Sequence, residues 1–189
     1  MNNYNEIDEI AVPILKQVLQ EAQDQWLSPD SKYKEYRTLQ IDKRGSFGER
    51  FFAQTLSRIY YRRLTIEYND GDQSDWDLKL NGMRFEIKTS SIDVNKKFQN
   101  EGIKENGDYD GILFLGITPN DLYIKFVKKK DIDFSKLHNR GERGTGRGYK
   151  WNFKIPDMIK VETLEDIKIE FENKFTDILN TKTIKKQRQ

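Results

Sequence analysis

The chain has 189 residues, 34% of them charged, and its formal net charge is +2. It contains no cysteine and one histidine, which excludes disulfides, thiolate zinc sites, cysteine nucleophiles and clusters of histidine ligands. Hard oxygen ligands are therefore the metal chemistry that we expect. The N-terminus is acidic and polar, and no apolar run approaches transmembrane length, so we expect a cytoplasmic protein without a signal peptide or membrane contact.

The charges are unevenly distributed, although their near balance gives no overall attraction to nucleic acid. Residues 1–31 contain six acids and one lysine, whereas residues 125–150 contain nine lysines and arginines against three acids. Residues 182–189 add four basic side chains and no acid. If DNA binds, we expect it at the later part of the chain, away from the N-terminal segment.

Apolar residues at helical spacing predict two helices before any strand. The first covers residues 5–26, where Pro13 requires the helix to begin or to kink, and its stripe consists of Ile7, Ile10, Ile14, Val18 and Ala22. Residues 30–44 are interpreted as a loop with a short helical turn. The second helix runs from about Ser46 to Tyr61, and its apolar face consists of Phe47, Phe51, Leu56, Ile59 and Tyr60.

A hairpin is the clearest local signal in the chain. Asn81-Gly82 joins two alternating strands, which follow a predicted first strand over residues 62–68 and a turn over 69–72. If the hairpin loop has two residues, the opposed pairs are Leu78 and Phe85, Asp77 and Glu86, and Asp75 and Lys88. Opposed carboxylates repel each other, so this pattern predicts a metal cation between Asp77 and Glu86.

The rest of the chain contains two further clear strands and one helix. Residues 90–108 are ambiguous between helix and irregular strand. Residues 112–117 are continuously apolar, which predicts a strand buried on both faces, and residues 122–127 alternate. A helix over 163–179, capped by Thr163, has a stripe of Leu164, Ile167, Phe171, Phe175 and Ile178. Residues 180–189 form a basic tail that we expect to be frayed.

Residues 138–150 form a basic loop rich in glycine. They lack the Gly-Lys-Ser/Thr sequence of a nucleotide-binding loop, and His138 is interpreted as a surface residue rather than a catalyst. Glycine permits close approach of the backbone to DNA, where Arg140, Arg143, Arg147 and Lys150 would contact phosphates or base edges. A surface loop without a partner is the alternative interpretation.

The hairpin also carries a resemblance to a known family. Asp77, followed by Glu86-Ile87-Lys88 on the next strand, resembles the Asp…(Glu/Asp)-x-Lys active site of the PD-(D/E)xK nuclease superfamily, which has the restriction-endonuclease-like fold. The acid-x-Lys triplet occurs five times in the chain, but only Glu86–Lys88 follows a strand and turn with an acidic partner in pairing register. The order of one helix and three strands is similar to the start of that core, and the likeness covers about residues 46–130.

The resemblance implies a Mg²⁺-dependent endonuclease acting on double-stranded DNA, nearest to type II restriction enzymes, in which Mn²⁺ can replace Mg²⁺. Asp77, Glu86 and the carbonyl of Ile87 would be the metal ligands, and Lys88 would stabilise transition-state charge or act as a base. Glu49 corresponds to an additional glutamate that some members contribute from the helix before the sheet, although a solvated helix residue is the equal alternative. Gln99 is supported by resemblance alone, within a Phe-Gln element that precedes an apolar strand.

Several alternatives remain open from the sequence. Asp75 replaces Asp77 as metal ligand if the hairpin loop is longer than two residues. The strand face could simply carry solvated, mixed charges. The protein could be a repair or recombination nuclease with structure selectivity, or a DNA-binding protein that keeps the fold without cleaving.

We therefore expect a single α/β domain over residues 1–189, with a restriction-endonuclease-like core and a mixed central β-sheet flanked by helices. One active site cuts one strand, and palindromic recognition implies two-fold symmetry, so we expect a homodimer on DNA. The acidic N-terminal helix and the apolar C-terminal helix are the candidate dimer surfaces.

Overall fold

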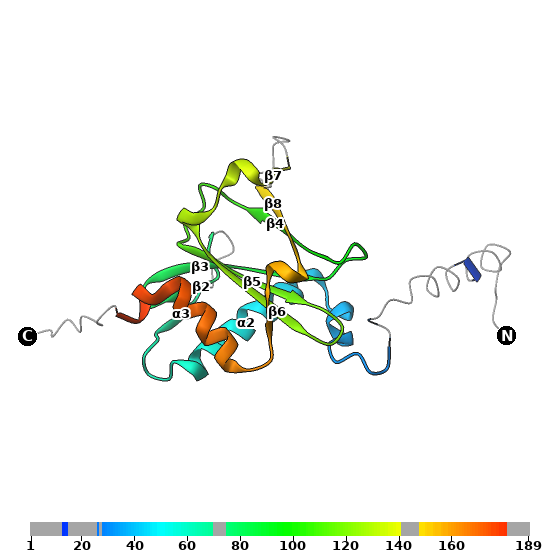
Figure 1. Cartoon of the computed structure of the whole chain (residues 1–189), viewed down its shortest axis with the longest axis horizontal. Coiled ribbons are helices and arrows are strands. Elements are labelled where there is room, and N and C mark those ends of the chain that lie inside the picture. Colours follow the sequence, from blue (N-terminus) through cyan, green and yellow to red (C-terminus); the bar gives the residue numbers. More distant parts are fainter. Residues whose placement is uncertain (1–12, 15–25, 27, 70–74, 141–147, 181–189) are drawn as a thin grey trace, which may run out of the picture.

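A mixed six-stranded sheet forms the centre of the protein (Figure 1). The computed structural model describes residues 13–14, 26, 28–69, 75–140 and 148–180. All neighbouring strands of the sheet are antiparallel except β3 and β5, which are parallel. In spatial order the strands are β1 (Ile66–Tyr68), β2 (Leu78–Leu80), β3 (Met83–Ser91), β5 (Gly111–Ile117), β6 (Leu122–Lys128) and β9 (Ile159–Val161). The predicted α/β class with a mixed sheet is confirmed.

Two helices cover one face of this sheet, and Figure 1 shows both on the same side. They are α2 (Ile41–Ile59) and α3 (Leu164–Asn180). Their buried side chains pack with alternate residues of β3, β5 and β6, and the phenylalanines of this core are Phe52, Phe85, Phe126, Phe171 and Phe175. This layer is the larger of two apolar cores.

A second, three-stranded sheet covers the opposite face (Figure 1). Its strands, in spatial order, are β4 (Lys97–Ile103), β8 (Tyr149–Lys154) and β7 (His138–Asn139). Short 3-10 helices lie in the connections: η2 (Lys34–Thr38), η3 (Lys129–Asp131), η4 (Phe134–Lys136) and η5 (Ile155–Asp157). Phe98 and Phe153 from the second sheet pack with Ile112 and Phe114 of β5 in the second apolar core. β5 is therefore buried on both faces, as its continuous apolar sequence predicted.

The hairpin has the predicted register, with Leu78 opposite Phe85 and Leu80 opposite Met83. Asn81 and Gly82 have φ angles of 46° and 93°, the left-handed backbone that a two-residue hairpin turn requires. The Asn81 side chain also accepts a 2.7 Å hydrogen bond from the Thr65 N–H, which joins the turn to the segment before β1.

Several predicted boundaries were wrong. α2 begins at Ile41 rather than near Ser46, so only the 3-10 helix η2 remains of the short turn predicted in residues 30–44. β1 is shorter than residues 62–68, because the chain turns at Arg62, where φ is 59°. The ambiguous segment 90–108 contains strand β4, and the ends of the 138–150 loop form β7 and the start of β8.

The C-terminal helix was predicted almost in full, but its role was not. Four of the five stripe residues, Ile167, Phe171, Phe175 and Ile178, are buried in the helix-side core, whereas Leu164 is 38% exposed. These four buried side chains are therefore not available to a dimer surface, whereas the C-terminal helix as a candidate dimer surface stays a prediction. Most of the predicted N-terminal helix (5–26) and the tail beyond residue 180 lie outside the described residues. None of the described helices has the length and apolar character needed to cross a membrane.

Candidate active site

Asp77 joins the end of β2 to the middle of β3. The backbone N–H of Asp77 donates to the Phe85 carbonyl at 2.8 Å, and its Oδ2 accepts from the Ile87 N–H at 2.6 Å. The β2–β3 ladder ends at the Leu78–Phe85 pair. The predicted strand pairing of Asp77 with Glu86 is therefore wrong. A side-chain bond replaces the next ladder bond and fixes the carboxylate at the residue between Glu86 and Lys88.

Glu86 and Lys88 point away from the helices. Phe85 and Ile87 lie in the helix-side core, so the alternation of β3 turns Glu86 and Lys88 toward the second sheet. Their side chains form an ion pair and are only 16% and 19% exposed. Gly102 of β4 lies beside them, since a Cβ atom built there would be 3.8 Å from Lys88 Nζ. The pair thus lies on the face of β3 that is turned toward the second sheet.

Burial and mutual repulsion oppose ionisation of the two carboxylates. Burial raises the pKa of Glu86 to about 7; the Lys88 charge acts against this rise and the Asp77 charge adds to it. Burial also raises the pKa of Asp77, against the Ile87 N–H and the Lys88 charge, which both lower it. A single lysine is therefore insufficient compensation for two buried negative charges, and the site favours an additional cation.

Glu49 lies close enough to interact electrostatically with Asp77. Burial raises the pKa of Glu49, the Asp77 charge raises it further, and Arg50 lowers it. The close contact of α2 with β3 explains why Glu49, on α2, lies near the site. A Cβ atom at Gly48 would lie 1.9 Å from Thr89 Oγ1, so only glycine lets the helix approach β3 this closely. The structure thus brings all four predicted catalytic residues into one region.

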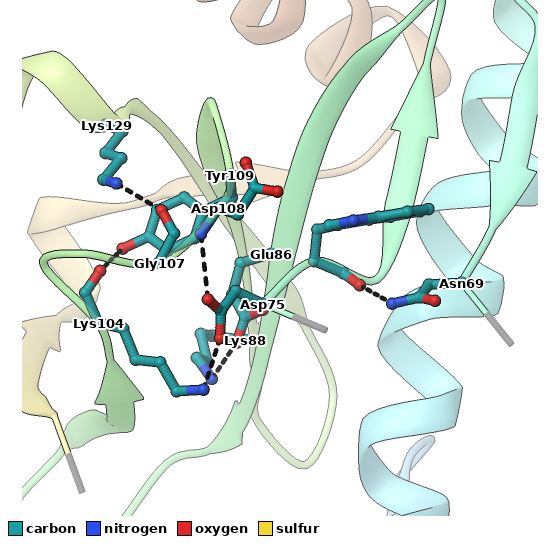
Figure 2. Close-up of polar contacts among 10 residues, drawn as sticks. Asn69, Asp75, Glu86, Lys88, Lys104, Gly107, Asp108, Tyr109 and Lys129 are labelled. Carbon is teal, nitrogen blue, oxygen red and sulfur yellow. Dashed lines mark hydrogen bonds and ion pairs between the residues drawn. The ribbon is translucent and has the colours of Figure 1, made fainter. Parts of the chain in front are cut away.

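Asp75 has a different environment from the one predicted. Its Oδ1 lies 2.5 Å from Lys104 Nζ, and its Oδ2 accepts from the Asp108 N–H at 3.1 Å (Figure 2). The predicted pairing of Asp75 with Lys88 is therefore wrong. Lys104 was missed by sequence reasoning, because it follows β4 in a segment without clear periodicity and is 29 residues from Asp75.

Gln99 lies on β4 and lines a neighbouring cavity. The cavity has a volume of about 450 Å³, and Lys88, Arg44 and Gln99 are among its lining residues. The Gln99 amide bonds to the side chains of Asp93 and Lys150. Gln99 thus lies near Lys88 but is already engaged by other side chains.

Two of the four predicted DNA-binding residues, Arg140 and Lys150, lie within the described residues. Arg140 forms an ion pair with Glu101 of β4, and Lys150 Nζ lies 3.4 Å from the same carboxylate. These two basic residues therefore meet on the second sheet. Arg143 and Arg147 lie outside the described residues.

The donor atoms of the site fit Mg²⁺. Proteins usually hold this ion through one or two carboxylates, and water and substrate phosphate complete the octahedron. Asp77 and Glu86 provide two such carboxylates. Within the described ranges, no group of three or more acidic, histidine or cysteine side chains could hold a metal by itself. A two-carboxylate site that needs further oxygens from water or substrate is what these residues can form.

Comparison with known proteins adds no family assignment: no protein-family model and no curated protein matches the chain. The chemistry of the site is therefore inferred from its own residues. Two partly buried acids with raised pKa values, a lysine ion-paired to one of them and a nearby glutamate are typical of a functional centre.

Proposed function

We propose that the protein is a Mg²⁺-dependent endodeoxyribonuclease that hydrolyses phosphodiester bonds in double-stranded DNA. The proposal includes a restriction-endonuclease-like core and places the enzyme nearest to type II restriction enzymes. One observation carries it: Asp77 and Glu86 are partly buried near each other and their charges repel, and Lys88, on the same strand as Glu86, forms an ion pair with Glu86.

The energetic cost of placing two carboxylates together favours a functional role for them over a purely structural one. Burying a carboxylate raises the free energy of its charged form, and a second carboxylate raises it again. A purely structural site would be more stable with one acid replaced by a neutral side chain. A divalent cation relieves both costs, because it compensates both charges at once.

The residues divide the reaction among them. Mg²⁺, when held by Asp77, Glu86 and the carbonyl of Ile87, would supply Lewis acidity and a more acidic bound water; Mn²⁺ is expected to substitute. Lys88 would orient the attacking water or stabilise the charge that develops on the phosphate. In hydrolysis the water oxygen bonds to phosphorus, the phosphorus–oxygen ester bond breaks, and the leaving oxygen gains a proton. Glu49 would help to hold the water or the cation from the helix side.

The substrate follows from the charge of the surrounding surface. Arg140 and Lys150 lie on the second sheet, next to the strand that passes Lys88, and Arg143 and Arg147 belong to the same loop. A cluster of basic side chains on the sheet that faces the candidate catalytic acids favours a polyanion such as DNA. Since one such site cuts one strand, we propose a homodimer on DNA. The dimer interface would not include the buried apolar residues of α3.

Supercoiled plasmid DNA tests the proposal directly. The protein should convert it to nicked and linear forms with Mg²⁺ or Mn²⁺, and should leave it intact with Ca²⁺ or a chelator. DNA binding without cleavage in any of these ions would instead assign a non-cleaving DNA-binding protein. Cleavage confined to branched or damaged DNA would assign a repair or recombination nuclease.

A further inference from the structure

A second ammonium group lies beside the candidate catalytic carboxylates. Lys104 follows β4, and its Nζ forms the 2.5 Å contact with Asp75 described above. The hydrogen bond to Asp75 raises the pKa of Lys104, and the nearby charge of Glu86 raises it further. Figure 2 shows the side chains of Lys104, from the segment after β4, and of Lys88, from β3, extending toward the same region. Lys104 thus interacts with Asp75 directly and with Glu86 through its charge.

The backbone around Lys104 is held firmly, whereas its side chain is open to solvent. The Lys104 carbonyl accepts hydrogen bonds from the Tyr109 hydroxyl at 2.7 Å and from the Gly107 N–H at 3.2 Å. Lys129 Nζ donates to the Gly107 carbonyl in the same turn (Figure 2). The Lys104 side chain is nevertheless 52% exposed. A fixed backbone with an exposed side chain suits contact with an arriving ligand.

A structural role explains the Lys104–Asp75 pair poorly. Exposed ion pairs contribute about 0–1 kcal/mol to stability. Lys160 and Asp121 form a comparable pair, 3.0 Å apart, and their side chains are 45% and 37% exposed. Lys160 lies on β9, at the edge of the sheet and separated from β3 by β5 and β6. The Lys104 pair differs from it by its position at Glu86.

We propose that Lys104 is a substrate-binding residue, which contacts a non-bridging oxygen of the DNA phosphate at the active site, and that Asp75 positions its ammonium before DNA arrives. This inference rests on the proposed nuclease function. A lysine stem is flexible enough for Nζ to leave Asp75 and meet the phosphate. Asp75 then keeps its hydrogen bond from the Asp108 N–H.

The test compares Lys104→Ala with Lys160→Ala as the matched control. Lys104→Ala should weaken binding of a short DNA duplex in Ca²⁺ and lower the log–log salt slope by about 0.9, the contribution of one phosphate contact. It should also slow single-turnover cleavage in Mg²⁺ by about 10²-fold, a typical cost of removing one transition-state contact. Lys160→Ala should change none of these quantities. Lys104→Arg should recover most of the binding.

Asp75→Asn separates positioning from metal binding. A positioning residue affects the reaction only through Lys104, so the double variant Lys104→Ala/Asp75→Asn should be no slower than Lys104→Ala. The Mg²⁺ concentration for half-maximal rate should stay unchanged in Asp75→Asn. A large rise in that concentration would make Asp75 a metal ligand and overturn its positioning role.

The possible outcomes distinguish the two proposals. If the unaltered protein neither binds nor cleaves duplex DNA, both proposals are wrong. If it binds or cleaves while Lys104→Ala behaves like Lys160→Ala, only the role of Lys104 is wrong. Equal urea stability of the two alanine variants is expected, and shows that any difference on DNA does not come from unfolding.

Discussion

The Asp77 carboxylate accepts a 2.6 Å hydrogen bond from the backbone N–H of Ile87. This bond takes the place of a ladder bond where the β2–β3 pairing ends. Ile87 lies between Glu86 and Lys88 in the sequence. The bond therefore holds the Asp77 carboxylate next to the backbone between these two residues. The local break in the sheet is thus what assembles the candidate site.

The raised pKa of Glu86 predicts that the protein loses stability as the pH rises. The folded-state pKa is about 7 and the ordinary value is 4.5, so the folded protein retains a proton that the unfolded chain has lost between these values. Glu86→Gln removes this penalty and should stabilise the metal-free protein by up to about 3 kcal/mol at pH 8, and by less than about 1 kcal/mol at pH 5. Urea unfolding at both pH values, with a chelator present, measures the difference.

Glu67→Gln is the control for this prediction. Glu67 pairs with Lys79 on the neighbouring strands, and its side chain is 51% exposed. It should show no comparable change between pH 5 and pH 8. Equal stabilisation by Glu86→Gln at both pH values would mean that burial of its charge is not the cause.

Lys88→Ala is expected to impair the chemical step more than metal binding. The single-turnover rate should fall by at least about 10²-fold, a typical contribution of a proton-transfer or charge-stabilising group. Loss of Lys88 also removes a charge that lowers the pKa of Glu86, so the remaining activity should shift toward higher pH. Rate measurements across pH and Mg²⁺ concentration test both effects, and Lys79→Ala is the control. An unchanged rate would remove Lys88 from the mechanism.

Gly48→Ala should destabilise the protein, whereas Gly45→Ala in the same helix should not. The added methyl at residue 48 would overlap Thr89 Oγ1, and overpacking of this kind costs about 1–3 kcal/mol. At residue 45 the nearest atom is Glu49 Oε1 at 3.7 Å, so the higher helix propensity of alanine should add about 0.5–1 kcal/mol. Thermal or urea unfolding of the two variants gives the comparison. Equal stabilities would contradict the close contact between α2 and β3.

Neutralising Arg143 and Arg147 together should weaken DNA binding and flatten its dependence on salt. Each lost phosphate contact reduces the log–log slope by about 0.9. Anisotropy titrations of a labelled duplex at several salt concentrations provide the slope, and Lys168→Ala on α3 is a control from the helix layer. If sequence preference relaxes at constant affinity, one of the arginines contacts a guanine edge. Unchanged slope and preference would place the loop away from DNA.

Local sequence patterns predicted the parts of the fold that depend on neighbouring residues. The Asn81-Gly82 turn determines the hairpin register, and the run from Ile112 to Ile117 identifies the strand buried on both faces. The start of α2 was missed although its predicted part already included Gly48, because Gly45, just before Ser46, disfavours a helix by intrinsic propensity. The contact of Gly48 with Thr89 explains why glycine is nonetheless required there.

Contacts between distant segments could not be predicted from such patterns. β4 pairs with β8 about 50 residues later, and no turn signal connects the two. The Lys104–Asp75 contact has the same origin. The hairpin pattern predicted that Asp77 and Glu86 interact, and their charges do, but not through direct strand pairing. The hydrogen bond from the Ile87 N–H to Asp77, which breaks the ladder, is visible only in the three-dimensional structure.

Cleavage by Asp77→Asn and Asp75→Asn, measured side by side, tests the central claim most directly. Single-turnover cleavage of plasmid DNA is followed as the Mg²⁺ concentration rises, and binding of the same DNA is measured in Ca²⁺. We predict that Asp77→Asn abolishes cleavage at every Mg²⁺ concentration while DNA binding persists, and that Asp75→Asn retains cleavage with an unchanged Mg²⁺ requirement. Full activity of Asp77→Asn, together with loss of activity in Asp75→Asn, would contradict the assignment of the metal-binding carboxylate.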